Sequence, residues 1–183
     1  MLKFFFFFNF IIFFLFYFSF YNFFIILDFG IILLYLLFYF ISSIRFAVEE
    51  WIQSTYPIHI LRDHVNHCIP MNGGMWGGVK GAISDMKELV ENWSSRDEYM
   101  ADLHFLEQKI YPNIRDKQIS HDSYCCDRYP NTKPYPTKRF QTYQHVGQVF
   151  DEFDQPRYMD IDGFIRGVPI PSSCRKQTDW IYG

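Results

Sequence analysis

The chain has 183 residues, with 17 basic and 20 acidic side chains and a formal net charge of −3. The two signs are interspersed and no basic patch is visible, which argues against a nucleic-acid partner. The averages conceal two unlike pieces, because 16 of the 22 Phe lie in the first 40 residues, whereas every His, Pro and Cys follows residue 50. We therefore divide the chain into residues 1–43 and a soluble piece, residues 44–183, with the length of one ordinary domain.

The first piece contains a predominantly apolar run, residues 4–27, without a formal charge and with Asn9, Ser19 and Asn22 as its only strongly polar side chains. A helix of about 20 residues crosses the roughly 30 Å hydrocarbon core of a bilayer, so this run is long enough to span it. Asp28 and Gly30 then interrupt the run, and residues 31–41 are too short for a second span. The pattern predicts a hydrophobic signal-anchor helix, which would make the protein a single-pass membrane protein of the secretory pathway, in the ER or Golgi.

The same segment has a second interpretation, as translated non-coding sequence. After the initiator Met, every residue from Leu2 to Phe40 except Ser19, Asp28 and Gly30 has a codon made only of A and T. Val and Ala, which are ordinary in natural spans, are absent from this stretch. The two interpretations stay open. If the segment is made, it is expected to partition into a membrane.

In the soluble piece, residues 46–54 are predicted to form a short helix that ends at Pro57, and residues 58–61 a brief strand. Ser84 is expected to cap a helix that continues to Trp93. The S-x-x-E spacing at 95–98 predicts a capping box that opens a helix through Ile110, with Pro112 just beyond its end. The segment from His121 onward is expected to form loops and short strands, with residues 142–150 as the best strand candidate. Alternating helices and short strands favour an α/β fold.

Three clusters could carry chemistry, and the first is the run Arg62-Asp63-His64-x-x-His67. Two imidazoles and a carboxylate within six residues could bind a metal ion, although hydrolytic zinc sites usually add a third ligand with a recognisable spacing. The alternative is a polar loop in which Asp63 orients His64 and Arg62 pairs with a carboxylate elsewhere.

The second cluster is the glycine-rich stretch at 73–78, Gly-Gly-Met-Trp-Gly-Gly. Glycines permit positive φ and a close approach of the backbone to a ligand. The stretch has neither the lysine of a P-loop nor the G-x-G-x-x-G spacing, so a sugar stacked on Trp76 is a more natural ligand than a phosphate. The alternative is a tight turn with a buried Trp76.

The third cluster combines Asp102, which lies among apolar positions of a predicted helix, with His121 and Asp122. The alternatives are an exposed helix face for Asp102 and an Asx-type cap, made with Ser123, for His121-Asp122. The four cysteines are even in number, which fits an oxidising compartment. Adjacent cysteines rarely bridge each other, so a framework would pair Cys125 and Cys126 with Cys68 and Cys174, in an order that the sequence leaves open.

Taken in order, these pieces resemble a family of glycosyltransferase-like proteins in the nucleotide-diphospho-sugar transferase superfamily. The resemblance covers about residues 47–183. The matching segments are AVEEW (47–51), the R-D-H-x-x-H run (62–67), GGMWG (73–77), D-x-x-F-L (102–106), Ile-Tyr-Pro (110–112) and HDSY (121–124), followed by KPYPTKR, VGQVFD and the closing DWIYG.

The resemblance implies that the soluble piece is the C-terminal portion of a Rossmann-like, A-type glycosyltransferase domain. It also implies a nucleotide sugar and a glycan or small-molecule acceptor as partners, with Mn²⁺ or Mg²⁺ as cofactor. Asp102 would be the catalytic residue on the acceptor side, and His121 would contribute to the metal site. The substrate-binding residues would be Arg62, Asp63, His64, Gly73, Gly74 and Trp76.

Two departures from the family pattern bear on activity. The family's helix commonly carries an Asp-Gln pair, whereas Leu103 follows Asp102 here. The Asp-x-Asp motif that holds the metal against the diphosphate should precede residue 47, but residues 1–46 contain a single acid, Asp28. We therefore expect a truncated glycosyltransferase-like chain that is inactive alone.

The sequence is compatible with two other functions. One is a membrane-anchored, non-catalytic carbohydrate-binding or scaffold protein that uses Trp76. The other is a small metal hydrolase that uses Asp63, His64, His67 and His121.

Overall fold

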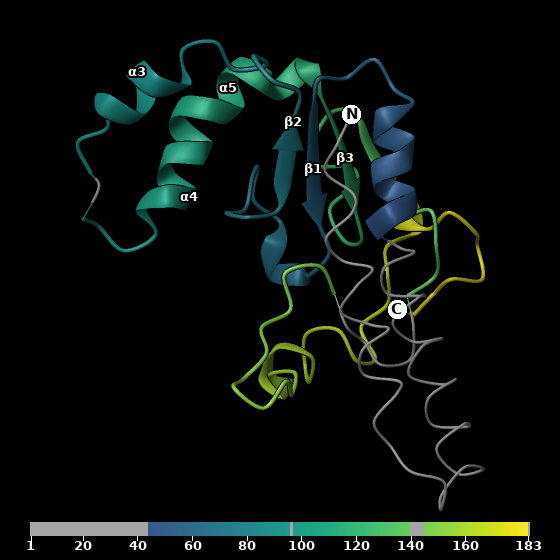
Figure 1. Ribbon diagram of the computed structural model, residues 1–183. Coiled ribbons are helices and arrows are strands. Elements are labelled where there is room, and N and C mark those ends of the chain that lie inside the picture. Colours follow the sequence, from purple (N-terminus) through teal and green to yellow (C-terminus); the bar gives the residue numbers. More distant parts are fainter. Residues whose placement is uncertain (1–43, 96, 140–144, 183) are drawn as a thin grey trace, which may run out of the picture. The chain divides into compact units, whose positions relative to one another are not determined.

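The computed structural model describes residues 44–95, 97–139 and 145–182 (Figure 1). All of these residues belong to one compact unit, Ile41–Gly183. The hydrophobic segment at 1–43, with the membrane span expected at 4–27, lies outside the described residues. Within the described part of the chain, we find no helix that combines the length and the apolarity needed to cross a bilayer.

A mixed four-stranded sheet forms the centre of the unit, in the spatial order β2 (Trp76–Gly78), β1 (Ile58–Arg62), β3 (Gln118–Asp122) and β4 (Thr132–Pro134). Strand β1 runs antiparallel to β2 and parallel to β3, and β3 is parallel to β4. The sheet and its helices confirm the predicted α/β class. Because β1 and β3 are parallel, their carboxyl ends, Arg62 and Asp122, lie side by side.

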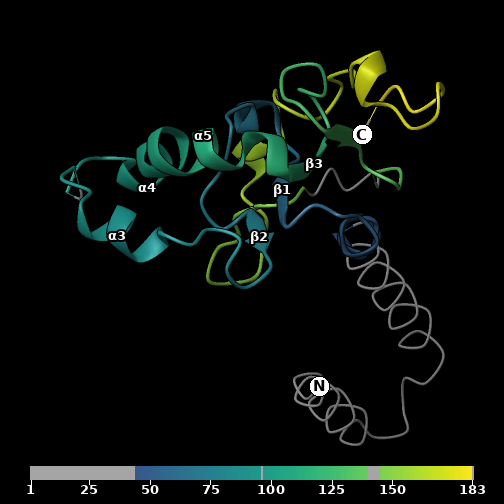
Figure 2. The same ribbon diagram turned by 90° about the horizontal axis from the view of Figure 1, so that it is seen from above.

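The two faces of the sheet are covered by different parts of the chain (Figure 2). On one face, Ile58 and Ile60 of β1 pack into the main core, whose other buried members are Met71, Leu106, Ile110, Tyr111 and Ile114. On the other face, the ring of His59 stacks on Trp51 of the helical residues 44–52, with 5.4 Å between the ring centroids. This alternation follows from the period of two along a strand.

The helical layer consists of α3 (Met86–Glu91) and a continuous helical stretch from Ala101 to Ile114. That stretch begins as α4 (Ala101–Phe105), widens into the π-helical η2 (Leu106–Ile110) and ends as α5 (Tyr111–Ile114). The 3-10 turn η3 (Arg115–Lys117) then leads directly into β3. Leu106, Ile110 and Ile114 are buried, so this stretch fastens the helical layer to the sheet.

Three predicted helix boundaries are wrong. Helix α3 follows Asp85 and has no side-chain cap, so Ser84 does not start it. Helix α4 follows Met100, whose φ of 61° is left-handed and interrupts any helix that begins at the predicted capping box, 95–98. Pro112 lies inside the helical stretch, at the first turn of α5, and not beyond its end.

The strand predictions are partly confirmed. The predicted strand at 58–61 corresponds to β1, and the predicted helix at 46–54 matches the helical residues 44–52. Of the expected strand at 142–150, residues 142–144 lie outside the described residues. Residues 145–150 contain no strand, only an isolated bridge between Phe150 and Pro156. The central strand β3 was not predicted, because its sequence, Gln-Ile-Ser-His-Asp, is too polar to suggest a strand that is buried along its whole length.

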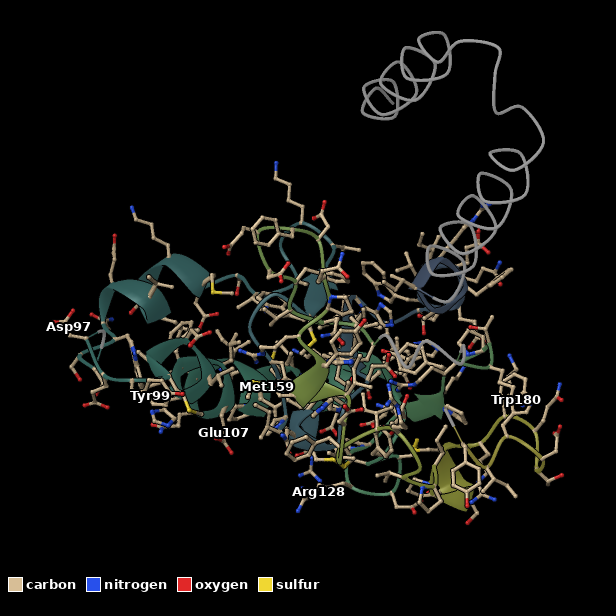
Figure 3. The ribbon with its side chains drawn as sticks, turned by 90° about the horizontal axis from the view of Figure 1, so that it is seen from below. Asp97, Tyr99, Glu107, Arg128, Met159 and Trp180 are labelled. Atoms are coloured by element: carbon tan, nitrogen blue, oxygen red, sulfur yellow. A yellow bond between two sulfur atoms is a disulfide. The ribbon has the colours of Figure 1, made fainter. Side chains whose placement is uncertain are left out.

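The C-terminal half is rich in loops and carries the short 3-10 turns η4 (Tyr158–Asp160) and η5 (Ser172–Cys174). Disulfides join Cys68 to Cys125 and Cys126 to Cys174, with Cα–Cα distances of 5.8 and 5.3 Å. Figure 3 shows Met159 and Trp180 in these loops, and Asp97, Tyr99 and Glu107 around the α3–α4 layer. The two bridges tie loop segments to the carboxyl end of β3.

Candidate functional site

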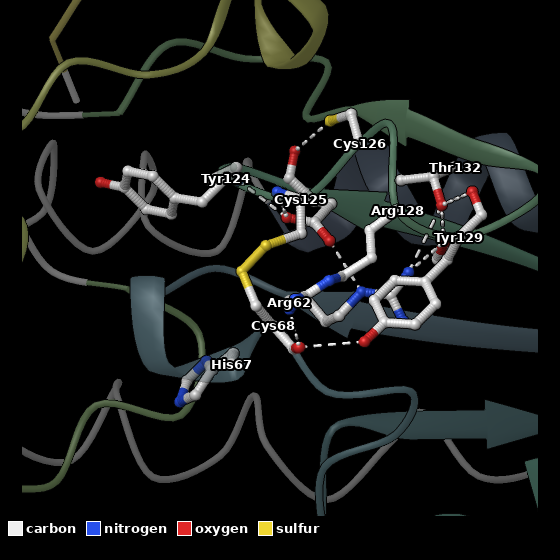
Figure 4. A network of polar contacts seen from close by, with 12 residues as sticks. Arg62, His67, Cys68, Tyr124, Cys125, Cys126, Arg128, Tyr129 and Thr132 are labelled. Atoms are coloured by element: carbon white, nitrogen blue, oxygen red, sulfur yellow. Dashed lines mark hydrogen bonds and ion pairs between the residues drawn. A yellow bond between two sulfur atoms is a disulfide. The ribbon is translucent and has the colours of Figure 1, made fainter.

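Arg62, at the carboxyl end of β1, is fully buried and pairs with Asp122 at the end of β3, with 2.7 Å between Nε and Oδ2 (Figure 4). Its other nitrogens donate to the Pro70 carbonyl at 2.7 Å and the Ser120 hydroxyl at 2.6 Å. The guanidinium also lies over the ring of Tyr129, 4.3 Å from the centroid. These contacts give Arg62 a structural role in this fold, as the polar-loop interpretation requires, and leave its role in substrate binding a prediction.

Asp122 is also a turn cap. Its Oδ1 accepts hydrogen bonds from the backbone N–H groups of Tyr124 and Cys125, both at 2.8 Å. The expected Asx-type turn is therefore present, although its donors are these two residues and not Ser123. Since the other carboxylate oxygen holds Arg62, one buried acid fixes both strand ends and the start of the next loop.

Asp63, directly after β1, is the centre of a second buried polar group. Its carboxylate accepts hydrogen bonds from the Ser123 hydroxyl and from Nη2 of Arg139, and from the backbone N–H of Val146 at 2.9 Å. Burial raises the pKa of Asp63, and the positive charge of Arg139 opposes the shift. Segments that are far apart in the sequence therefore meet at the carboxyl ends of β1 and β3.

Three imidazoles gather beside Asp63. The ring centroid of His64 is 5.2 Å from that of His67 and 4.8 Å from that of His145, and the His67 and His145 centroids are 5.8 Å apart. His64 Nδ1 accepts a hydrogen bond from the backbone N–H of Asn66 at 3.0 Å. The structure therefore adds His145 to the pair that the R-D-H-x-x-H spacing suggested.

His121 lies elsewhere, on the face of the sheet covered by the helical residues 44–52. Its Nδ1 is 2.8 Å from Nε2 of His59, and its Nε2 is 3.3 Å from the carboxylate of Glu50. Burial lowers the pKa of His121, and Glu50 opposes the shift. Burial, with a smaller contribution from His121, lowers the pKa of His59 to about 3. Both ring nitrogens of His121 are thus engaged, so the ring as placed does not fit a ligand of Mn²⁺ or Mg²⁺.

Glu50 links this histidine pair to the surface. Burial by itself would raise the pKa of Glu50, but hydrogen bonds from Lys176 and His121 lower it overall. Lys176 lies 3.1 Å and Lys133 lies 3.9 Å from the carboxylate. A charged Glu50 favours a proton on His121 Nε2, which leaves His121 Nδ1 to accept the hydrogen bond from His59.

Asp102 and the glycine-rich turn are brought together. A β-carbon built on Gly73 would lie 2.5 Å from Oδ2 of Asp102, so the carboxylate lies against the turn where residue 73 has no side chain. Asp102 also lines a surface hollow of about 240 Å³, together with Val90, Trp93, Ala101 and Phe105.

The hollow has an aromatic wall with a cation nearby. The rings of Trp93 and Phe105 meet edge to face with their centroids 5.7 Å apart, and the Lys109 ammonium lies 5.8 Å from the Trp93 centroid. Trp76, in contrast, is a half-buried residue of β2 that packs against the main core. Sugar stacking on Trp76 therefore stays a prediction, and the aromatic residues that line this hollow are Trp93 and Phe105.

The remaining predicted residues fall into separate places. Gly74 has a φ of 74°, and a β-carbon built on it would meet no atom within 4 Å, so it serves the turn and leaves room beside it. Arg62, Asp63 and His64 share the strand ends, while His121 lies on the opposite face from the main core. The proposed hydrolase set of Asp63, His64, His67 and His121 is therefore not one cluster.

Sequence reasoning missed Arg139, His145, Glu50 and Trp93. None of them stands in a motif spacing with its partners, and Arg139 lies 76 positions from Asp63 in the sequence.

An Asp-x-Asp spacing does occur at 160–162, on a turn where exposed Asp162 pairs with Arg166 at 3.0 Å. Among the described residues, the single group of three ligand-type side chains with converging atoms is Asp122, Cys126 and Cys174, and its two cysteines form a disulfide.

The chain matches no protein-family model, no curated protein and no solved structure with which it was compared.

Proposed function

We propose that the chain is the acceptor-side portion of a glycosyltransferase-like protein and that the hollow beside Asp102 takes a sugar. The observation that carries the proposal is the contact between Gly73 and Asp102 at the rim of an aromatic hollow. Two separate segments of the family resemblance, the glycine turn and the D-x-x-F-L helix, meet there. A carboxylate beside aromatic rings suits a ligand that has hydroxyl groups and apolar ring faces.

The dimensions of the hollow point to one sugar ring. Its volume of about 240 Å³ lies below the roughly 300–1,000 Å³ typical of sites for drug-sized ligands. Asp102 is exposed, so its carboxylate can accept hydrogen bonds from sugar hydroxyls without a large cost of desolvation. In a complete transferase the same carboxylate would act as the general base that removes the proton of an acceptor hydroxyl.

The resemblance supplies the rest of the proposal. It places the sheet within a Rossmann-like, A-type glycosyltransferase domain, with a nucleotide sugar as donor, a glycan or small molecule as acceptor and Mn²⁺ or Mg²⁺ at the diphosphate. Residues 1–46 carry no Asp-x-Asp, and the described geometry of His121 offers no nitrogen to a metal ion. The activity proposed for this chain by itself is therefore sugar binding at the Asp102 hollow, without transfer.

The test is sugar binding by the full chain in a non-ionic detergent, measured by saturation-transfer NMR and titration calorimetry over a panel of mono- and disaccharides. Asp102→Asn and Trp93→Leu are each expected to weaken binding about tenfold, as for the loss of one hydrogen bond to a charged group or one packed ring. Asp116→Asn, an exposed acid on η3, is the matched control. A folded chain that binds none of the sugars, or variants with unchanged affinity, would overturn the proposal.

A second assay addresses activity. Incubation of the same chain with nucleotide sugars and Mn²⁺ should give no turnover. Robust turnover would disprove the inactivity of this chain while leaving the sugar site intact.

The second candidate function is a membrane-anchored, non-catalytic carbohydrate-binding or scaffold protein. The hollow favours this function because α3, α4 and the loop between them supply its lining residues, so sugar binding would not require a nucleotide-binding half. It predicts cooperative unfolding of a fragment of residues 44–183 that retains sugar binding. A fragment that is molten or aggregated would count heavily against it.

A further inference from the structure

Buried hydrogen-bond donors without acceptors surround Asp63. In the part of the chain that the structure describes, neither Nη1 of Arg139 nor the hydroxyls of Tyr124 and Tyr135 have a hydrogen-bond partner, although all three atoms are buried. The Arg139 side chain is 7% exposed and Tyr135 is 9% exposed. A buried polar atom without a partner costs free energy, so native structures nearly always satisfy it with protein, water or an ion.

Three donors already use the carboxylate of Asp63. Asp63 Oδ1 accepts from Ser123 and Arg139, and Oδ2 accepts from the Val146 N–H. The Arg139 guanidinium lies 5.8 Å from the centroid of Tyr124, which places the tyrosine in the same group. Burial is the largest cause of the raised pKa of Tyr135. The charge of Asp63 raises this pKa further, whereas the charge of Arg139 lowers it, so both side chains lie close to Tyr135.

The three imidazoles belong to the same group, because His64 follows Asp63 and His145 precedes Val146, which bonds to Asp63. With Nδ1 accepting from Asn66, the proton of a neutral His64 is on Nε2, which makes that nitrogen a donor and not a metal ligand. Among the described side chains, these histidines do not form a set with converging ligand atoms. The cluster therefore presents hydrogen-bond donors, including the second arm of the Arg139 guanidinium, which suit an anion and not a cation.

The location is favourable for a ligand. In open α/β sheets, ligands bind beyond the carboxyl ends of parallel strands, and this cluster follows the carboxyl ends of β1 and β3. Tyr124 and His67 are half-buried, so the cluster reaches the surface. Arg139 offers a planar fork, of which one arm holds Asp63 and the other lacks an acceptor.

We infer that the carboxyl ends of β1 and β3 form a binding site for a phosphate-type oxyanion, held by Arg139 and Tyr124 with the imidazoles of His64, His67 and His145 around it. The oxygens of the anion accept from Nη1 of Arg139 and from the Tyr124 hydroxyl. The site is separate from the sugar hollow, which is lined by residues of α3, α4 and the loop between them. It does not depend on the proposed sugar transfer.

The experiment is calorimetric titration of the full chain, in a non-ionic detergent and a chloride-based buffer, with inorganic phosphate, pyrophosphate and uridine diphosphate. One anion is expected to bind per chain, and Tyr124→Phe is expected to weaken binding about tenfold, the effect of one hydrogen bond to a charged group. This variant removes only a hydroxyl without a partner, so it should fold. Arg139→Lys keeps the charge but loses the fork, and it should also weaken binding.

The controls are Tyr158→Phe, an exposed tyrosine, and Arg128→Lys, an exposed arginine. Phosphate should raise the thermal midpoint of the wild-type chain and of both controls, and raise that of Tyr124→Phe much less. Equal affinity for pyrophosphate and uridine diphosphate would identify the phosphates alone as the ligand, and tighter binding of the nucleotide would add recognition of the nucleoside. The inference would be overturned if none of the three anions bound the folded wild-type chain at an anion concentration of about 100 times that of the protein. It would also be overturned if Tyr124→Phe and Arg139→Lys both bound with unchanged affinity.

Discussion

The Nε2 of His59 lies 2.8 Å from the Nδ1 of His121, and both rings are buried on the face of the sheet opposite the main core. A neutral pair shares a single proton across this contact, and Glu50 holds the far side of His121. The pair therefore resists protonation, which couples the stability of the fold to pH.

The first prediction concerns that coupling. The pKa of His59 is about 3 in the folded chain, below the ordinary value of 6.5, so the unfolded chain binds a proton first as the pH falls. The contribution of His59 is complete above about pH 6.5 and is lost between pH 6.5 and 3, at up to about 1.4 kcal/mol per pH unit. His59→Gln, which keeps a donor for His121 but cannot titrate, should reduce this slope in denaturant unfolding measured at pH 7, 6, 5 and 4.

The control for this prediction is His104→Gln, a half-buried histidine of α4. Asp63 titrates with the opposite sign, because its raised pKa favours the folded state as the pH falls. The comparison of each variant with wild type removes that contribution. An identical slope in wild type and His59→Gln would contradict the assignment.

The second prediction concerns the buried ion pair. Arg62→Met leaves the carboxylate of Asp122 buried without its partner, and such changes cost about 3–5 kcal/mol. Arg128→Met removes an exposed arginine that donates to the Cys68 carbonyl, and it should cost less than about 1.5 kcal/mol. Chemical denaturation at pH 7 measures both. A stable Arg62→Met chain that had lost only ligand affinity would show that Arg62 serves binding and not the fold.

The third prediction concerns the contact between the turn and α4. Gly73→Ala brings a methyl group to 2.5 Å from Oδ2 of Asp102, an end atom of an exposed side chain that can rotate away. We expect a loss of stability below about 1 kcal/mol, together with a loss of sugar affinity similar to that of Asp102→Asn. Thermal unfolding and sugar titration of the same preparation test this. Retention of full affinity in Gly73→Ala would separate the glycine from the site.

The fourth prediction concerns the C-terminal bridge. The disulfide between Cys126 and Cys174 closes a loop with a sequence separation of 48, so its loss should cost about 4 kcal/mol, less if the unfolded chain keeps structure. The variant Cys126→Ser/Cys174→Ser should therefore unfold at lower denaturant concentration. Peptide mapping under non-reducing conditions should recover 68–125 and 126–174 linkages from wild type, and a 68–174 linkage would contradict the structure.

The local patterns determined several features by themselves. The apolar spacing around Trp51 and the run Ile58–Leu61 were enough to predict the helical residues 44–52 and β1, because both elements bury a regular face. The sequence also favoured an exposed position for Asp102 and suggested that Arg62 pairs with a distant carboxylate, both as alternatives to a role in chemistry. It limited the disulfides to cross-pairings of Cys125 and Cys126 with the other two cysteines.

The tertiary structure alone decided the rest. Strand β3 is buried along its whole length although Gln118, Ser120 and Asp122 bring polar groups onto one of its faces. Arg62, Thr132 and the Pro130 carbonyl, from other segments, give each of these side chains at least one hydrogen-bond partner. No local period reveals such a strand, since its stability depends on partners supplied from elsewhere in the chain. Long-range packing also separates His121 from His64, joins His145 and Arg139 to Asp63, and brings Gly73 against Asp102. Each of these contacts joins segments that are far apart in the sequence and share no recognisable spacing. Only the packing of the sheet with its helices determines them.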